Sequence, residues 1–184
     1  MLRKLKSFYL VGGTALALQI GHRKSIDFDL FKNKKLDVGQ IHKWAKDCNV
    51  EKTLIDENNQ VTYQISGVNI TFLEYPFDVK PVFDSDLGIY LAQPLSIGAM
   101  KAYAIGRRSK WKDYVDIYFL LKQYSLKEIA KEAKKIFSSL FNEKIFREQL
   151  CYFEDIDFSE EVEFLDNTVS EKAIKEALIK VADK

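Results

Sequence analysis

The sequence predicts an α+β protein, in which a mixed β-sheet with flanking helices is followed by a helical lobe. Two observations predict this class. Short apolar segments separated by turn residues fill the first half of the chain, as strands do. From Pro94 onward the apolar residues recur at helical spacing instead. We therefore expect an α/β core at residues 1–92 and a helical lobe at residues 93–184, packed on the core.

Turn chemistry divides the first half into its elements. Gly12-Gly13 ends a short apolar strand, Gly21 ends an Ala- and Leu-rich helix, and Ser66-Gly67 separates two strands. The alternation of apolar and acidic residues at 26–31 has the period of a strand. The expected strands are 8–11, 26–31, 50–55, 61–65, 68–73 and, in addition, 87–91, and the expected helices are 14–20 and 38–48.

The second half is expected to be helical throughout. Ser125 and Ser170 precede two of the apolar periodic segments and are good N-cap residues. The expected helices are 95–108, 111–123, 126–141, 143–153 and 170–182.

Composition excludes several classes. The chain has 184 residues, of which 47% are hydrophobic, and its 28 basic residues balance 27 acidic ones. No overall field attracts it to nucleic acid or membrane, and no apolar run approaches the ~20 residues that span a bilayer. Cys48 and Cys151 lack metal-site spacing. With no signal peptide, these features predict a cytoplasmic protein and no membrane partner.

Asp27 and Asp29 are the first candidate site residues. On a strand they would project from one face, roughly 6–7 Å apart along the chain. Two carboxylates this close repel, by about 4 kcal/mol at ~4 Å and an effective dielectric of about 20. Mg²⁺ would relieve that repulsion, because it binds one or two carboxylates together with substrate phosphates. The alternative is an edge strand whose polar face happens to be acidic.

The segment upstream favours the metal site. Gly12, Gly13 and Thr14 join a strand to a helix, which turns backbone N–H groups and the positive end of the helix dipole toward an anion. Glycine permits close approach of a phosphate, and Thr14 adds a hydroxyl donor. A Walker A sequence is absent.

The complete string FYLVGGTALALQIGHRKSIDFDLF resembles the opening of AbiEii/AbiGii-type nucleotidyltransferases, which belong to the DNA polymerase β-like superfamily. The resemblance implies a minimal nucleotidyltransferase sheet, with Asp27 and Asp29 as ligands of Mg²⁺ (or Mn²⁺) and Gly12, Gly13 and Thr14 at the phosphates of an NTP substrate. It also implies a toxin of a bacterial toxin–antitoxin or abortive-infection (phage defence) system. The acceptor would be RNA, such as a tRNA end, or a protein, and the partner a cognate antitoxin.

A second segment, LSIGAMKAYAIGRRSKWKDYVDIYFLL, resembles the downstream motif of the same family. Lys101 lies mid-helix among apolar residues, so its ammonium either meets a counter-charge such as a triphosphate or extends to the surface. Asp113 and Asp116 share a helix face, where Asp116 should be buried, and a structural ion pair with Lys101 or an arginine of the preceding turn would explain them. The resemblance implies that Lys101 and Arg108 bind nucleotide and that the aspartates complete or brace the site.

One position departs from the pattern. Related enzymes usually carry a third carboxylate on a neighbouring strand, where this sequence has Thr71; Glu74 is close but has the opposite strand parity. A rival hypothesis is therefore a catalytically inactive nucleotide- or partner-binding module of the same fold. Asp27, Asp29, Lys101, Asp113 and Asp116 nevertheless favour an enzyme.

Three charged stretches stay open to interpretation. His22-Arg23-Lys24 is read as a basic turn facing phosphate or as a solvated loop. The basic stretch 107–112 is a candidate for RNA contact, beside Tyr103 and Trp111. The acidic stretch 154–163 is expected to be a solvated tail that packs its aromatic residues, with antitoxin docking as the alternative.

Overall fold

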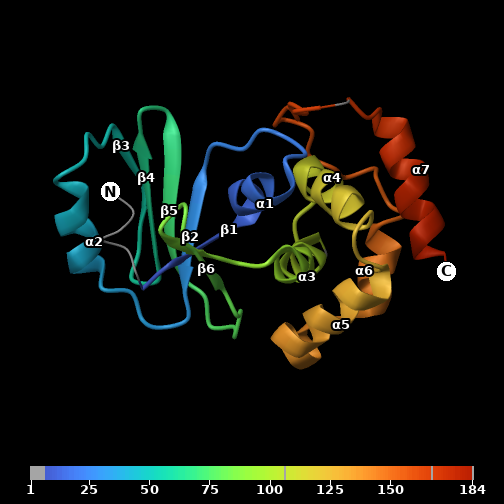
Figure 1. Cartoon of the computed structure of the whole chain (residues 1–184), viewed down its shortest axis with the longest axis horizontal. Helices are drawn as coiled ribbons and strands as arrows, with labels where there is room; N and C mark the ends of the chain where they lie inside the picture. The colour runs from blue at the N-terminus through green and yellow to red at the C-terminus, as the bar shows by residue number, and fades with distance from the viewer. Residues whose placement is uncertain (1–6, 106, 167, 184) are drawn as a thin grey trace. The chain divides into compact units, whose positions relative to one another are not determined.

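The computed structural model of the chain describes residues 7–105, 107–166 and 168–183 (Figure 1). The chain divides into two compact units. The first contains the chain up to Leu18 and then Ser25–Ala92, and the second contains Gln19–Lys24 and the chain from Gln93 onward. The short segment Gln19–Lys24 therefore groups with the helical half, although it lies among the first elements of the sequence.

The first unit is built on a seven-stranded mixed sheet with the strand order β3-β4-β5-β2-β1-β7-β6. The pairs β1–β7 and β2–β5 are parallel, and the others are antiparallel. The strands are β1 (Tyr9–Val11), β2 (Phe28–Lys32), β3 (Lys52–Asp56), β4 (Gln60–Ile65), β5 (Val68–Glu74), β6 (Val82–Asp84) and β7 (Ile89–Leu91). The predicted α+β class with a mixed sheet is confirmed.

Helix α1 (Gly12–Ile20) follows β1 directly, and α2 (Val38–Ala45) packs on one face of the sheet. There the Trp44 ring meets Phe72 edge-on at 5.1 Å. Leu30 lies beside Phe72 in the parallel pairing of β2 with β5, and both are buried. Side chains alternate along a strand, so Asp29 and Thr71 face away from α2.

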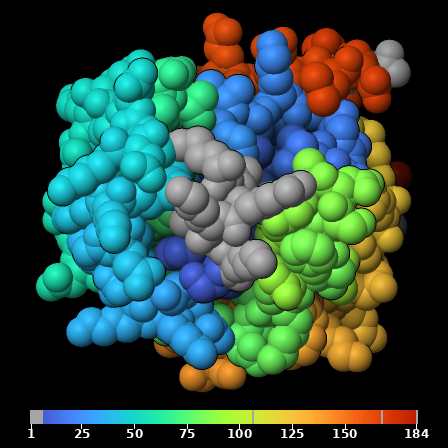
Figure 2. All heavy atoms as spheres, turned by 60° about the vertical axis from the view of Figure 1, so that its left-hand side comes forward, coloured from blue at the N-terminus to red at the C-terminus, as the bar shows by residue number. Residues whose placement is uncertain are grey.

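A hollow of about 390 Å³ lies beside α2, on the side of the first unit that Figure 2 brings forward. Its lining includes Phe8, Trp44, Lys32 and Lys43. Neither the aspartate pair nor the Gly-Gly-Thr turn lines this hollow, so it is separate from the site predicted from the sequence.

The second unit is helical, and α3 packs against both α4 and α5. A Cβ added at Gly98 would lie 3.2 Å from Leu120, which shows how closely α3 approaches α4. Ser125 caps α5 in a capping box with Glu128, and Ser170 caps α7, as predicted. The helices are α3 (Pro94–Ile105), α4 (Trp111–Leu120), α5 (Leu126–Phe137), α6 (Glu143–Gln149) and α7 (Glu171–Ala182).

Several predicted boundaries were wrong; among them, the helices expected to end at residues 48, 123 and 153 end at Ala45, Leu120 and Gln149. Strand β2 begins at Phe28 rather than at residue 26, and Ile26 is exposed instead of packing against a helix. The helix expected at 126–141 ends at Phe137, because Ser138 adopts a positive φ of 50° and begins a separate 3-10 turn. The short strand β6 was not predicted. None of the helices in the described part of the chain has the length and apolar character needed to cross a membrane.

Candidate active site

Asp29 lies in the middle of the sheet of the first unit. In β2 it pairs with Val11 of β1 on one side and with Thr71 of β5 on the other. Asp27 lies one residue before β2 and is exposed, and its Oδ1 accepts a hydrogen bond from the backbone N–H of Asn69 at 2.9 Å. The two carboxylates are thus held by different means, one by the strand and the other by a bond to the next strand.

Gly12 brings the turn after β1 into direct contact with the second aspartate. It is the first residue of α1 and has a φ of +72°, in the left-handed region that favours glycine. A Cβ at this position would lie 2.3 Å from Oδ2 of Asp29. The position therefore requires glycine twice, for its backbone conformation and for the space that the carboxylate occupies. Gly13 follows as the second residue of α1 and is half-buried.

Thr14 connects the start of α1 to the loop before β2. Its side chain is buried, its hydroxyl donates to the backbone carbonyl of Asp27, and its Oγ1 lies 3.0 Å from the Ser25 hydroxyl. The hydroxyl that the sequence assigned to a phosphate is thus engaged by the loop that carries Asp27. Contact between Thr14 and nucleotide stays a prediction.

The position of the missing third carboxylate is as the sequence predicts. Thr71 lies directly beside Asp29, and its hydroxyl is 3.2 Å from that of Thr62 on β4. Glu74 does not replace it: the register of β2 and β5 runs without a bulge to the pair Lys32 and Glu74, and Glu74 accepts a hydrogen bond from Leu36 N–H. The neighbour of Asp29 on β5 is therefore a neutral hydroxyl.

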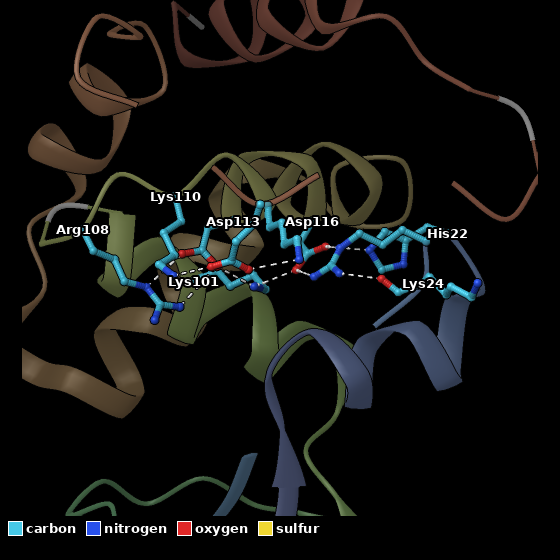
Figure 3. A network of polar contacts seen from close by, with 10 residues as sticks. His22, Lys24, Lys101, Arg108, Lys110, Asp113 and Asp116 are labelled. Atoms are coloured by element: carbon cyan, nitrogen blue, oxygen red, sulfur yellow. Dashed lines mark hydrogen bonds and ion pairs between the residues drawn. The ribbon is translucent and has the colours of Figure 1, made fainter. Parts of the chain in front are cut away.

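The second unit holds a buried ionic cluster, shown in Figure 3. The Nζ atom of Lys101, on α3, lies 2.7 Å from Oδ1 of Asp113 and 2.6 Å from Oδ2 of Asp116, both on α4. All three side chains are buried, and Asp116 has no exposed surface at all. The counter-charge that an ammonium in this setting requires is thus supplied by the protein itself. Contact between Lys101 and phosphate stays a prediction.

His22 and Arg23 complete this cluster, and sequence reasoning missed them. Nε2 of His22 and Nε of Arg23 both lie 2.7 Å from Oδ1 of Asp116, and Arg23 also donates to its Oδ2 at 3.0 Å. Both residues are buried, so the reading of this turn as a solvated or phosphate-facing loop was wrong for them. The one feature of the sequence that could have indicated them was Asp116. A carboxylate expected to be buried on an apolar helix needs more than one partner, so cationic partners besides Lys101 were to be expected.

The charges of the cluster reinforce one another. Burial by itself would raise the pKa of Asp116, but Lys101, His22 and Arg23 outweigh it and hold that pKa well below its ordinary value. Burial would lower the pKa of Lys101, but the two carboxylates hold it above its ordinary value. Asp113 is likewise shifted down, against burial, by Lys101 and Arg108. Asp113, Asp116 and Lys101 therefore stay ionised at neutral pH.

Arg108 lies at the edge of the cluster, where its Nε donates to Oδ2 of Asp113 at 3.0 Å. Its side chain is 57% exposed, so its outer face remains open to solvent. This pairing is the structural alternative that the sequence offered for the two aspartates. A role for Arg108 in nucleotide binding stays a prediction.

The rest of the basic stretch 107–112 is occupied by contacts within the second unit. Arg107 stacks on the Tyr103 ring at 3.5 Å, and both Lys110 and Lys112 pair with Glu160. Trp111 is buried. None of these four side chains stands free as the sequence suggested for an RNA-contacting patch.

Metal binding rests on few protein ligands. Within residues 7–105, 107–166 and 168–183, no group of three or more His, Cys, Asp or Glu side chains is placed to hold a metal ion. Asp27 and Asp29 nevertheless supply carboxylate oxygens of the kind Mg²⁺ prefers, and a pair suits an ion that completes its shell with substrate phosphates and water. The donor set thus fits a divalent ion bound together with a nucleotide.

Comparison with known proteins assigns the chain to a family. The sequence model of the family described as "Nucleotidyl transferase AbiEii toxin, Type IV TA system" matches residues 3–78. An uncharacterized protein of Aquifex aeolicus (strain VF5), aq_aa25, is 35% identical over 154 residues, which cover 80% of this chain and 74% of that protein. The chain belongs to the AbiEii nucleotidyltransferase toxin family.

Solved structures agree with the AbiEii assignment at the level of the fold. JHP933 from Helicobacter pylori has a TM-score of 0.60 at 19% identity, over 99% of this chain and 84% of that one. MenT4, a nucleotidyltransferase toxin from Mycobacterium tuberculosis, has a TM-score of 0.61 at 10% identity, over 96% of this chain and 74% of that one. Identities this low show a shared fold alone.

AbiEii membership sets the functional class of the chain. It is a nucleotidyltransferase of a toxin family, for which an NTP substrate and, in general, a divalent metal ion are implied. A type IV toxin–antitoxin family also implies an antitoxin partner. The resemblance found in the sequence is therefore confirmed.

Proposed function

We propose that the chain is a Mg²⁺- or Mn²⁺-dependent toxin that moves a nucleoside monophosphate from an NTP to an acceptor. The acceptor is an RNA end, such as that of a tRNA, or a protein hydroxyl. The toxin would serve a toxin–antitoxin or phage-defence system in the cytoplasm, with a cognate antitoxin. One observation carries the proposal: Asp27 and Asp29 lie at the Gly-Gly-Thr turn, with the carboxylate of Asp29 against Gly12.

Asp27 and Asp29 are the residues that would hold the metal. A divalent ion bound there would neutralise charge on the triphosphate as the acceptor oxygen displaces pyrophosphate in line. Asp27 retains one oxygen beyond the one that accepts from Asn69 N–H, and it is exposed to solvent. Neutral Thr71 beside Asp29 makes this a site with two protein carboxylates.

The turn and its threonine have separate tasks in this proposal. The backbone N–H groups at the start of α1, at Gly12 and Gly13, bind phosphate oxygens, favoured by the helix dipole. Thr14 is a positioning residue, because its hydroxyl holds the backbone of Asp27. Asp27 and Asp29 thereby keep a fixed separation before substrate arrives, which lowers the cost of assembling the site.

The cluster on α3 and α4 contributes a cation held in place. In this proposal Lys101, which Asp113 and Asp116 keep protonated, and Arg108, the more exposed cation, bind the nucleotide phosphates as the family resemblance implies. In this proposal the two aspartates position Lys101 and do not bind metal. Their existing ion pairs support that assignment, since each carboxylate is already engaged by at least two cationic groups.

A second candidate function is an inactive nucleotide- or partner-binding module of the same fold. The observation that favours it is Thr71, a neutral residue directly beside Asp29. Such a module would bind NTP without transferring any part of it.

The two functions separate in a label-transfer experiment. Each α-labelled NTP is incubated with Mg²⁺, total tRNA and the wild type, or with the variant Asp27→Ala/Asp29→Ala. The matched control is Asp84→Ala/Asp86→Ala, which removes an identically spaced pair, one at the end of β6 and one in the turn that follows it.

We expect label on RNA or on protein with the wild type and the control, and background with the Asp27 and Asp29 variant. The position of the label identifies the acceptor. Mg²⁺-dependent thermal stabilisation by NTP without any transfer would support the binding module, and equal transfer by all three proteins would refute the metal site.

A further inference from the structure

Two charged stretches of the second unit meet in the structure. An acidic strap, Asp155–Leu165, forms no helix or strand and is fastened at each end by backbone hydrogen bonds. At one end Asp157 N–H donates to Ser109 O at 2.7 Å, and Trp111 N–H donates to Asp157 O at 3.1 Å. At the other end Lys24 N–H donates to Glu163 O at 2.7 Å. The strap thus connects the 109–111 segment to the His22–Lys24 turn.

Glutamates of the strap neutralise lysines at both ends. Glu160 pairs with Lys110 and, at 3.0 Å, with Lys112, while Glu163 pairs with Lys24 at 2.9 Å. Lys24 and Lys110 are also labelled in Figure 3, on opposite sides of Asp116. Two carboxylates of the strap are therefore paired with three lysines from other segments of the second unit.

These contacts are weak compared with those of the core. Both glutamates are exposed, 43% for the Glu160 side chain and 66% for Glu163, and exposed ion pairs contribute little because water and salt screen them. Phe158 packs on Trp111 at 5.2 Å but remains 42% exposed itself. Besides the backbone hydrogen bonds at its ends, the strap is held by a hydrogen bond from Ser109 to Asp155 and by contact of Phe164 with Phe119 at 6.0 Å. Because these contacts are few and lie near the surface, the strap can open locally without unfolding the helices.

We propose that Lys24, Lys110 and Lys112 form a binding surface for the phosphodiester backbone of RNA, and that the acidic strap occupies this surface until RNA displaces it. The carboxylates of Glu160 and Glu163 stand where backbone phosphates would pair with the lysines. RNA is the partner because the inference rests on the proposed transfer to an RNA acceptor. Displacement of the strap makes binding selective, since RNA must outcompete an intramolecular polyanion.

The test is RNA binding by the full chain in EDTA without nucleotide, so that it does not depend on transfer. The probe is a fluorescein-labelled single-stranded RNA 20-mer of mixed sequence, titrated at several salt concentrations. Glu160→Gln/Glu163→Gln removes the competing carboxylates. The matched control is Glu171→Gln/Glu176→Gln, which removes two carboxylates that pair with lysines on α7.

We expect Glu160→Gln/Glu163→Gln to bind RNA at least 5-fold more tightly than the wild type, and the α7 control to stay within 2-fold of it. Adding Lys24→Gln, Lys110→Gln and Lys112→Gln to the first variant should abolish the gain. It should also make the slope of log Kobs against log salt shallower by about 2, from three lysines at about 0.7 each. Equal affinities for the wild type and the Glu160 and Glu163 variant, or an equal gain in the α7 control, would overturn the proposal.

Hydrogen exchange of the wild type distinguishes a displaced strap from a purely structural one. If the strap were only structural, RNA would not change the exchange rates of the amides that fasten it. RNA should speed exchange of the amides of Asp157, Lys24 and Trp111, whose bonds fasten the strap. Unchanged or slower exchange at these amides would overturn the inference even if RNA binds. If RNA does not speed exchange at these amides but label transfer is normal, the displacement of the strap is refuted and the proposed function stands. If RNA speeds exchange but no label is transferred, only the proposed function is refuted.

Discussion

Substitution of Gly12 by alanine tests whether the turn after β1 sets the position of the Asp29 carboxylate. Gly12 has a φ of +72°, and an added Cβ would meet Oδ2 of Asp29 at 2.3 Å and its Cγ at 3.2 Å. The backbone of β1 and β2 cannot move apart easily to make room for the Cβ, because Val11 and Asp29 are paired in the sheet. The carboxylate of Asp29 must therefore rotate away.

The matched control is Gly21→Ala. Gly21 has a similar φ of +62°, but an added Cβ there would meet nothing within 4 Å. Both variants incur the left-handed backbone penalty of about 1–2 kcal/mol in the free energy of unfolding. Gly12→Ala adds the cost of an off-rotamer Asp29, about 0.5–1.5 kcal/mol. Gly12→Ala should thus be less stable than Gly21→Ala by about 0.5–1.5 kcal/mol.

The affinity for Mn²⁺ should distinguish Gly12→Ala from Gly21→Ala. Titration of Mn²⁺ in the presence of a non-hydrolysable NTP, followed by electron paramagnetic resonance, measures affinity without requiring transfer. We expect Gly12→Ala to lose roughly 10–100-fold in Mn²⁺ affinity, as displaced ligand geometry does elsewhere, and Gly21→Ala to keep wild-type affinity. Wild-type Mn²⁺ binding by Gly12→Ala, or an equal loss in Gly21→Ala, would refute the coupling between this turn and Asp29.

Four further predictions concern the loop, the cluster and the sheet. Thr14→Val should weaken Mn²⁺ binding about 10-fold while Thr14→Ser keeps it; equal binding by both would show that the hydroxyl does not position Asp27. Asp116→Asn should lower the free energy of unfolding in urea by roughly 3–5 kcal/mol, since it leaves buried cations short of a charge; a loss under about 1 kcal/mol would contradict this. The depressed pKa of Asp116 contributes stability above its unfolded pKa of about 3.9, so the wild-type melting temperature should fall as the pH drops below about 4, and fall less in Asp116→Asn. Thr71→Asp should destabilise the metal-free protein and increase its stabilisation by Mn²⁺, both seen by thermal melting, because it sets a carboxylate beside Asp29; a metal-independent melting temperature would count against the site.

Most of the sheet could be predicted because its signals are local, whereas Asp27, expected on the same strand as Asp29, lies before that strand begins. Alternation in a strand, turn residues and the glycines after β1 all act within a few residues, and the register placed Thr71 beside Asp29 as expected. The alternation of apolar and acidic residues gave a wrong strand start at Ile26. This residue continues the alternation, but it lies before β2 and its side chain is 57% exposed. A hydrophobic residue at the edge of a strand is a weak boundary signal, since pairing partners decide where a strand begins.

The buried cluster was only half predictable. Asp116 among apolar helix residues indicated a buried charge, and the sequence left Lys101, Arg107 and Arg108 as its candidate partners. Nothing in local spacing relates Asp116 to Arg23, which is 93 residues away in sequence. Partners at that separation depend on the tertiary fold, so the sequence states the need for a counter-charge but not its source.

The string that carries the family resemblance, residues 8–31, contributes to both units of the structure. The sequence alone does not reveal this division. Gly12, Thr14, Asp27 and Asp29 belong to the first unit, where they hold one another by direct contacts. The segment Gln19–Lys24 between them belongs to the second unit and is bound there by Asp116 and the strap. The position of the turn His22–Lys24 between the Gly-Gly-Thr turn and the two aspartates suggests a third contact with substrate. His22 and Arg23 are buried against Asp116, however, so this turn anchors the segment to the second unit instead. Because only Ser25 and Ile26 separate Lys24, the last residue of this anchor, from Asp27, loss of the ion pair between Arg23 and Asp116 should disturb the loop of Asp27 through the chain itself.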